Sequence, residues 1–191
     1  MTDDATLAET LLLHAEAVLA DAGIQGFTLE EVARRSGMGD DAVAAVFGDS
    51  HGILDALFIQ GHENFHANDI EASADPVGDL LRGFDMYRDW SLAHPVYYRL
   101  MFAPLDQGYE PSPNAGNAGW RNFEALTIRA GRAVASGTIE GAPLDIALDL
   151  WAVAHGSVML ELAGPGIFHD APEERYRARM RRTLDSFRPA R

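Results

Sequence analysis

Residues 23–57, GIQGFTLEEVARRSGMGDDAVAAVFGDSHGILDAL, constrain the fold more than any other part of the chain. Thr28 followed three residues later by Glu31 is a capping-box pattern, which predicts the start of a helix. The SGMG run then ends that helix, because glycine accepts the backbone conformations of a tight turn. A second short helix and a longer helix beginning near Ser50 are expected to follow. Two helices joined by a glycine-containing turn predict a helix-turn-helix head.

Hydrophobic residues at helical spacing continue along the rest of the chain. We therefore expect an all-α fold of about nine helices, with a head over residues 1–49 and a helical body over residues 50–191. Residues 103–119 are rich in Pro, Gly and Asn and predict a loop long enough to act as a mobile lid. Besides the two short helices of the helix-turn-helix, helices are predicted over residues 5–22, 50–72, 77–93, 96–102, 120–136, 144–163 and 173–187.

Composition limits the classes of partner. The net charge of −14 argues against nucleic acid or an anionic membrane as the default partner. The chain has no cysteine, which excludes a thiol nucleophile and a cysteine metal site. Its start is acidic, unlike a signal peptide, and no apolar run reaches the roughly 18 residues of a membrane span. We expect a cytoplasmic protein that does not associate with membranes.

The helix-turn-helix stretch resembles the DNA-binding head of the tetracycline-repressor (TetR) family. The residues that pack this head in the family have counterparts here: Gly23, Thr28, Val32-Ala33, Ser36-Gly37-Met38, Val43, Phe47 and Ile53-Leu54. The family's DNA-contacting positions have changed: Gly39 replaces the turn serine, Ala42 a small polar residue, Ala44 a tyrosine, Val46 a histidine and Ser50 the phosphate-binding lysine. The resemblance implies a head that keeps the family's packing residues and is degenerate at the positions that contact DNA.

The charge of the head leads to the same expectation without the family. Residues 1–60 contain eleven Asp or Glu and two Arg, a net charge of −9. The predicted groove-entering helix begins with Asp40-Asp41 and has no Arg, Lys, Asn or Gln to read base edges. Acidic residues also suit a helix N-terminus, but they repel the phosphates on which DNA affinity depends. We therefore expect DNA binding to be lost.

Two strings in the body, AHPVYYRLMF at residues 93–102 and WAVAHG at residues 151–156, also resemble TetR-family C-terminal domains. The resemblance implies a domain that binds a ligand and forms a homodimer through its last two helices. We assign these helices to residues 144–163 and 173–187, because the first is apolar nearly all round and the second carries an apolar stripe.

The string HENFH, residues 62–66, places His62 and His66 one helical turn apart, a spacing that can hold zinc. A third histidine is absent at the spacing of zinc proteases, where Ala72 stands, although Asp69 shares the face. The alternative is two histidines that face a ligand cavity, and we predict no metal.

Aromatic residues with a few polar tips are typical of small-molecule sites, and equally of helical cores. Neither a phosphate-binding loop nor a dinucleotide fingerprint is present, so no cofactor is expected and catalytic residues cannot be assigned. Two functions remain open. The protein either binds a hydrophobic or aromatic small molecule without reading DNA, as a binder or an acid–base enzyme of secondary metabolism, or is a ligand-responsive repressor. The candidate ligand-binding residues are His62, His66, Trp90, His94, Tyr97, Tyr98, Phe102, Trp120, Phe123, Trp151 and His155.

Overall fold

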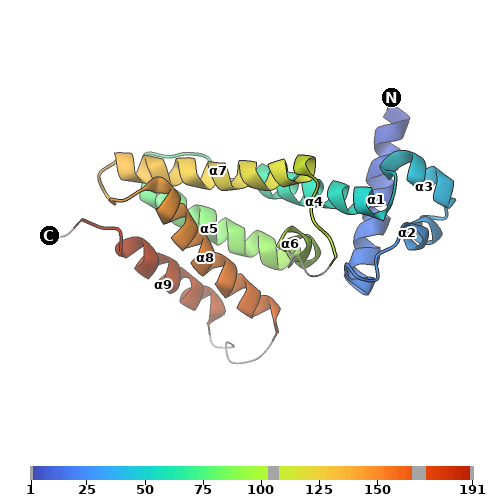
Figure 1. Ribbon diagram of the computed structural model, residues 1–191. Coiled ribbons are helices and arrows are strands. Elements are labelled where there is room, and N and C mark those ends of the chain that lie inside the picture. Colours follow the sequence, from blue (N-terminus) through green and yellow to red (C-terminus); the bar gives the residue numbers. More distant parts are fainter. Residues whose placement is uncertain (1, 103–107, 165–170, 190–191) are drawn as a thin grey trace. The chain divides into compact units, whose positions relative to one another are not determined.

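The computed structural model describes residues 2–102, 108–164 and 171–189. Within these ranges the chain forms nine helices and no strand, which confirms the all-α prediction (Figure 1). The helices are α1 (Thr2–Ala22), α2 (Leu29–Ser36), α3 (Asp40–Phe47), α4 (Ser50–Ala67), α5 (Pro76–Ala93), α6 (Pro95–Met101), α7 (Pro113–Ala135), α8 (Pro143–Leu162) and α9 (Pro172–Asp185).

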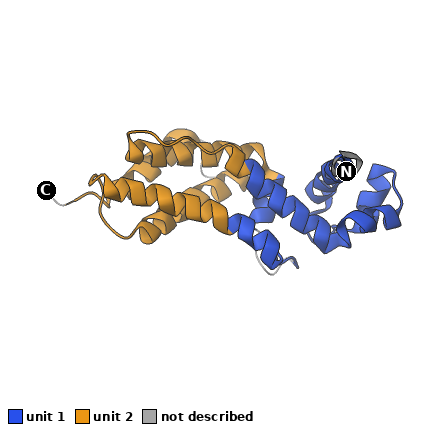
Figure 2. Cartoon of the chain, turned by 90° about the horizontal axis from the view of Figure 1, so that it is seen from above, with its two compact units in different colours: residues 1–64, 96–119 blue, residues 65–95, 120–191 orange. Residues whose placement is uncertain are grey.

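The helices form two compact units, coloured separately in Figure 2. Unit 1 comprises residues 1–64 and 96–119, and unit 2 comprises residues 65–95 and 120–191. Unit 1 therefore holds α1 to α3, most of α4, α6 apart from Pro95, and the start of α7. Unit 2 holds the end of α4, α5, the rest of α7, α8 and α9.

The helix-turn-helix begins and ends as its sequence dictates. Thr28 Oγ1 accepts a hydrogen bond from the backbone N–H of Glu31 at 3.2 Å, which caps α2. Gly37 ends α2 with a φ of 73°, a left-handed conformation that glycine adopts without strain. Asp49 caps α4, since its Oδ1 accepts from the Gly52 N–H at 2.9 Å. Apolar side chains with no exposed surface fill the space between the helices: Leu11, Ala15, Val18, Val32, Ala33, Val43, Ile53 and Leu57.

In unit 2, α8 packs against both α9 and α5. The Tyr176 hydroxyl of α9 is buried and donates to the Phe84 carbonyl of α5 at 2.7 Å. Arg88 of α5 forms a two-point ion pair with Glu161 of α8, at 2.9 and 2.7 Å. These polar contacts fix the three helices around an apolar core made mainly of Leu80, Phe84, Ile146, Leu150, Val158, Met180 and Leu184.

The helix predicted over residues 50–72 ends earlier, at Ala67. The next residues leave the helix and meet Arg129 of α7, whose Nη2 donates to Asp69 Oδ2 at 2.8 Å and lies 3.4 Å from the Ile70 carbonyl. This tertiary ion pair, which the local sequence does not reveal, replaces the last helical turn.

The loop predicted over residues 103–119 is wrong at its C-terminal end, because α7 begins at Pro113. Ser112 Oγ accepts from the Ala115 N–H at 3.3 Å, and Pro113 occupies the first helical turn, where proline is favoured. The buried side chains of Ala115 and Ala118 offset the weak helix propensity of the glycines and asparagines around them. The predicted lid residues 103–107 lie outside the described residues.

No single helix in the described part of the chain has both the length and the apolar character of a membrane span. The bent pair α3 and α4, which meet at 54°, passes that test only when the two are taken together.

Candidate functional site

The head contains two arginines, Arg34 and Arg35, and both are paired with carboxylates. Arg34 forms a two-point ion pair with Glu31, with both N–O distances at 2.7 Å. Arg35 contacts Glu31 at 2.8 Å and Asp21 at 2.6 Å. Hydrogen bonds from the two guanidinium groups lower the pKa of Glu31 to about 2, so its carboxylate is charged at neutral pH. The positive charge of the head is therefore compensated within the head.

The surface of α3 carries acidic and apolar side chains. Asp40 and Asp41 are exposed in its first turn, and Ala45 and Val46 are exposed further along. Readers of the major groove commonly present Arg, Lys, Asn or Gln to base edges, and α3 contains none of them.

Ser50, at the family's phosphate-binding position, has a role inside the head. Its Oγ accepts a hydrogen bond from the Leu29 backbone N–H at 2.8 Å, so the start of α4 satisfies a free amide at the start of α2. The side chain that would face phosphate in the family thus supports the helix-turn-helix packing here.

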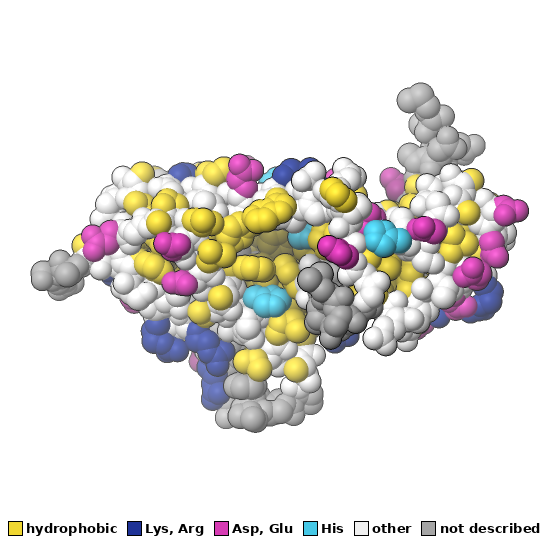
Figure 3. All heavy atoms as spheres, in the orientation of Figure 1, with side chains coloured by type: hydrophobic (Ala, Val, Ile, Leu, Met, Phe, Trp, Pro, Cys, Tyr) yellow, Lys and Arg dark blue, Asp and Glu magenta, His cyan; other side chains and the backbone are white. Residues whose placement is uncertain are grey.

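Ring side chains of unit 2 form one continuous series of contacts, which we call the aromatic row: Trp120, Phe123, Trp151, His155, Tyr87, Phe65, Trp90 and His94. Its first part joins α7 to α8, with ring centroids 6.2 Å apart for Trp120–Phe123, 6.0 Å for Phe123–Trp151 and 5.7 Å for Trp151–His155. Trp120 is 70% exposed. Figure 3 shows hydrophobic side chains gathered around a hollow on the face where α7 and α8 run.

The second part of the aromatic row joins α8 to α5 and to the end of α4. The Tyr87 hydroxyl lies 3.5 Å from His155 Nδ1. Phe65 meets Tyr87 and Trp90 edge-on at 5.8 and 5.3 Å, and His94 stacks on Trp90 at 4.9 Å. These separations suit favourable aromatic pairs. Phe65 and His155 are only half-buried and His94 is exposed, so the row is reachable from solvent.

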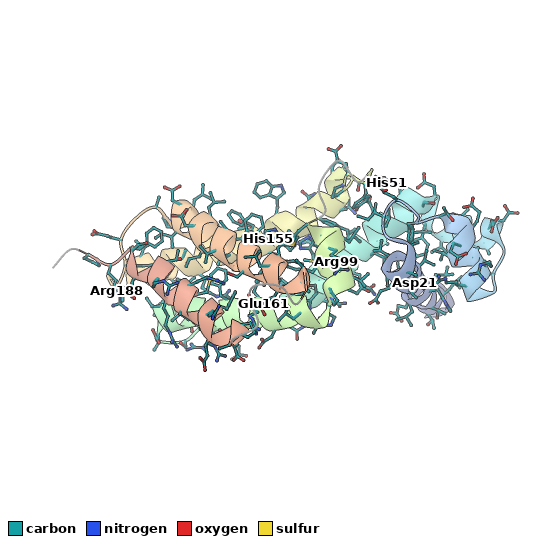
Figure 4. The ribbon with its side chains drawn as sticks, turned by 90° about the horizontal axis from the view of Figure 1, so that it is seen from below. Asp21, His51, Arg99, His155, Glu161 and Arg188 are labelled. Carbon is teal, nitrogen blue, oxygen red and sulfur yellow. The ribbon has the colours of Figure 1, made fainter. Side chains whose placement is uncertain are left out.

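The aromatic row contains polar atoms as well as rings. Burial lowers the pKa of His155, so its imidazole is neutral at neutral pH. Trp90 Nε1 is buried, and no described residue accepts a hydrogen bond from it. Figure 4 labels His155 and Glu161, two α8 residues that contact α5 through Tyr87 and Arg88 respectively. The row combines planar apolar surface with a few polar groups, as small-molecule sites do.

A second aromatic group lies within unit 1. His62 contacts Phe58 at 4.6 Å and Phe102 at 6.4 Å, and Phe102 contacts Tyr98 at 4.9 Å. Tyr97 is separate from this group: its hydroxyl donates to Gln60 Oε1 at 2.7 Å and lies 3.1 Å from Glu16 Oε2. Burial, with the charge of Glu16, raises the pKa of Tyr97. Tyr97 therefore holds α6 to α1 and α4.

The HENFH motif does not assemble a metal site among the described residues, where no group of three or more His, Asp or Glu side chains is placed to hold an ion. His62 is buried whereas Glu63 and His66 are exposed. Asp69, which the sequence places on the same helix face as His62, is instead bound by Arg129.

The sequence candidates thus separate into two groups. Trp90, His94, Trp120, Phe123, Trp151 and His155 belong to the aromatic row, His62, Tyr98 and Phe102 to the group in unit 1, and Tyr97 and His66 to neither. Phe65 and Tyr87, which complete the row, are absent from the sequence candidates. The spacing of Tyr87 three residues before Trp90, on one helix face, was the available signal.

The exposed side of α8 carries four large apolar side chains beside Asp145 and Asp149 in the single chain. Leu144 is 51% exposed, Leu148 42%, Met159 42% and Leu160 45%. Large side chains of this kind clustered on one helix are typical of surfaces that a partner covers. The sequence predicted a helix buried on several sides, and one chain alone does not provide all of that burial.

Comparison with known proteins places these features in a family. Residues 80–187 match the model described as Tetracyclin repressor-like, C-terminal domain. A Rhodococcus sp. RHA1 protein of unknown function is 25% identical, with a TM-score of 0.82 and 96% of each chain covered. The TetR family transcriptional regulator PfmR from Thermus thermophilus is 18% identical, with a TM-score of 0.73 over 92% of this chain and 97% of that one. The SmeT–triclosan complex is 17% identical, with a TM-score of 0.69 over 95% and 91%. No curated protein matches the chain.

Proposed function

The chain belongs to the tetracycline-repressor (TetR) family, and from this premise we propose that its body binds a hydrophobic, aromatic small molecule while its head no longer reads operator DNA. The fold is that of a TetR-family regulator with a ligand-binding C-terminal domain.

The aromatic row supports the ligand part of the proposal. It offers stacked and edge-on rings from α4, α5, α7 and α8, several of them half-buried or exposed. Such surfaces bind flat apolar molecules, and the polar atoms of the row can orient them. One structural neighbour is SmeT in complex with triclosan, and this neighbour supports a ligand in the body of this chain as well.

The pairing of Arg34 and Arg35 with Glu31 and Asp21 is the observation that carries the proposal about the head. DNA affinity comes largely from cations that displace counterions from phosphates. A phosphate that approaches either arginine must compete with a carboxylate already bound at 2.6 to 2.8 Å. The exposed Asp40 and Asp41 of α3 add repulsion at the surface that would enter the major groove.

The test is fluorescence anisotropy of a labelled duplex from upstream of the protein's own gene, beside a scrambled duplex, from about 20 to about 200 mM salt. We expect no saturable, sequence-selective binding at the lowest salt. Glu31→Gln is the matched variant, because it removes the shared carboxylate charge and keeps the size of the side chain. It is expected to gain weak, salt-sensitive binding to both duplexes.

A ligand-responsive repressor is the second candidate. The intact helix-turn-helix frame favours it, since the Thr28 cap, the Gly37 turn and the Ser50 hydrogen bond all preserve the geometry of a DNA-binding head. If the native duplex binds selectively, and the complex weakens steeply with salt, this candidate replaces our proposal.

We also propose a cytoplasmic homodimer formed by the segments 144–163 and 173–187. The exposed leucines of α8 support this assembly, because a second copy would cover them.

A further inference from the structure

Trp90 holds a polar atom that the described chain leaves unsatisfied. Its side chain is only 5% exposed, and its Nε1–H is buried without an acceptor. The backbone carbonyl of the same residue is already engaged, since it lies 2.9 Å from both the N and the Nδ1 of His94. Buried tryptophan N–H groups usually have a partner, so this donor stands out.

The surroundings of this donor are planar and apolar. Phe65 packs edge-on against the indole at 5.3 Å, and His94 stacks on it at 4.9 Å with an interplanar angle of 23°. Phe65 also contacts Tyr87, which continues the row toward His155. A flat molecule that packs against this row would make aromatic contacts and bring an acceptor atom to Nε1.

The chemistry of the buried groups defines what that molecule carries. An indole N–H is only a donor, so the ligand atom that meets it must be an acceptor. His155 is neutral at neutral pH because burial lowers its pKa. Arg88, the arginine that α5 carries between Tyr87 and Trp90, is already bound by Glu161. A carboxylate on the ligand would therefore lose its hydration without gaining the charge of Arg88.

We propose that the ligand of this body is an uncharged, flat aromatic molecule bearing a carbonyl oxygen, and that Trp90 Nε1–H donates a hydrogen bond to that oxygen. The inference rests on the proposed ligand function and adds the chemical class of the ligand and the residue that selects it.

Fluorenone and fluorene are suitable probes, because they share a planar tricyclic shape and differ in the carbonyl oxygen. Isothermal titration calorimetry on the full chain is expected to show that fluorenone binds about tenfold more tightly than fluorene. A difference of this size corresponds to one buried hydrogen bond between neutral groups. A fluorenone carboxylate is expected to bind more weakly than fluorenone, because its charge is uncompensated.

Trp90→Phe keeps a ring and removes the donor. It is expected to bring the affinities for the two probes together while fluorene binding is maintained. Tyr176→Phe is the matched control, since it removes another buried donor of unit 2, the hydroxyl bound to the Phe84 carbonyl, and is expected to keep the preference for fluorenone.

A second measurement does not depend on the folding of a variant for its result. In ¹⁵N–¹H spectra of the unmodified chain, the indole signal of Trp90 is expected to shift with fluorenone and to stay nearly still with fluorene. Selective labelling with ¹⁵N-indole tryptophan limits the spectrum to the three tryptophans.

Equal affinity for the two probes, or an unmoved Trp90 indole signal in the fluorenone complex, would overturn the carbonyl inference and leave the ligand function standing. Binding of neither probe would count against the proposed ligand function, and the inference would fall with it.

Discussion

At the scale of single residues, Asp79 shows how one carboxylate organises part of unit 2. Its side chain is fully buried in α5, and it accepts hydrogen bonds from the Ser73 backbone N–H at 2.8 Å and the Ser73 hydroxyl at 2.6 Å. Arg82 also binds it, and Arg132 of α7 lies 3.3 Å away. The Ser73 hydrogen bonds and the two arginines lower the pKa of Asp79 to about 2.

Asp79→Asn is expected to lower Tm by about 5 to 10 °C at neutral pH, because it leaves two arginines without their shared charge. The folded-state pKa lies below the ordinary value of 3.8, so the carboxylate stabilises the fold above about pH 4. This contribution is lost as pH falls from about 4 to about 2, and the difference between the variant and the parent should shrink over that window. Calorimetry across this range measures it.

Asp89→Asn provides the comparison, since the Asp89 side chain is 72% exposed and contacts Arg88 at 3.4 Å. It is expected to change Tm by no more than about 2 °C at any pH in the series. A constant Tm difference for Asp79→Asn down to pH 2 would contradict the assignment of its stability to the carboxylate charge.

Residue types could be predicted from sequence better than residue pairs. Tryptophan, tyrosine and histidine stood out as candidate ligand residues, and most of those in unit 2 do lie in one row. The pairing of Ser73 with Asp79, and of Asp69 with Arg129, joins residues distant along the chain or ordinary in type. Such contacts depend on how helices pack, which no local pattern encodes.

At the scale of helices, the sequence predicted the central residues of the helices well and their first and last residues less well. Apolar spacing gave α5, α8 and α9 to within two residues of their observed bounds. It failed where tertiary contacts decide the end of a helix, as at Ala67, beyond which Arg129 draws the chain away. It failed again at Pro113, where burial of Ala115 and Ala118 extends α7 through a glycine-rich segment. The Ser112-Pro113 pair was the cue for that helix start.

Asp55 of α4 holds the segment that precedes α7. Its Oδ1 accepts from the Tyr109 hydroxyl at 2.8 Å and from the Ser112 N–H at 3.2 Å, while Tyr109 is only 3% exposed. Asp55→Ala is expected to reduce the free energy of unfolding by about 2 kcal/mol, because it leaves the buried hydroxyl without its acceptor. Urea unfolding provides the measurement.

Asp55→Asn separates hydrogen bonding from charge, since its amide oxygen can accept both bonds. It is expected to retain most of the stability that Asp55→Ala loses. If both variants lose stability equally, the charge of Asp55 matters and the two hydrogen bonds do not explain its role.

At the scale of the whole molecule, the exposed apolar side chains of α8 support the proposed homodimer. Leu148 and Leu160 of α8 are 42% and 45% exposed. The double variant Leu148→Glu with Leu160→Glu is expected to raise the dimer dissociation constant at least about 100-fold, because pairing would bury four carboxylates without partners. Sedimentation equilibrium of the parent and the variant measures the change.

Leu13→Glu is the matched control, because Leu13 is a 68% exposed leucine on α1 of the head. It is expected to leave the association unchanged. A parent protein that sediments as a monomer at micromolar concentration would contradict the proposed dimer, and the apolar face of α8 would then need another partner.

The aromatic row also determines which part of this protein tryptophan fluorescence reports on. All three tryptophans of the chain, Trp90, Trp120 and Trp151, belong to the row and therefore to unit 2. Tryptophan fluorescence therefore reports on unit 2 alone, because the helix-turn-helix head contains no tryptophan. Circular dichroism at the helical band reports on both units. A heating curve recorded in both channels will therefore reveal, without any label, whether the head melts together with unit 2 or separately from it.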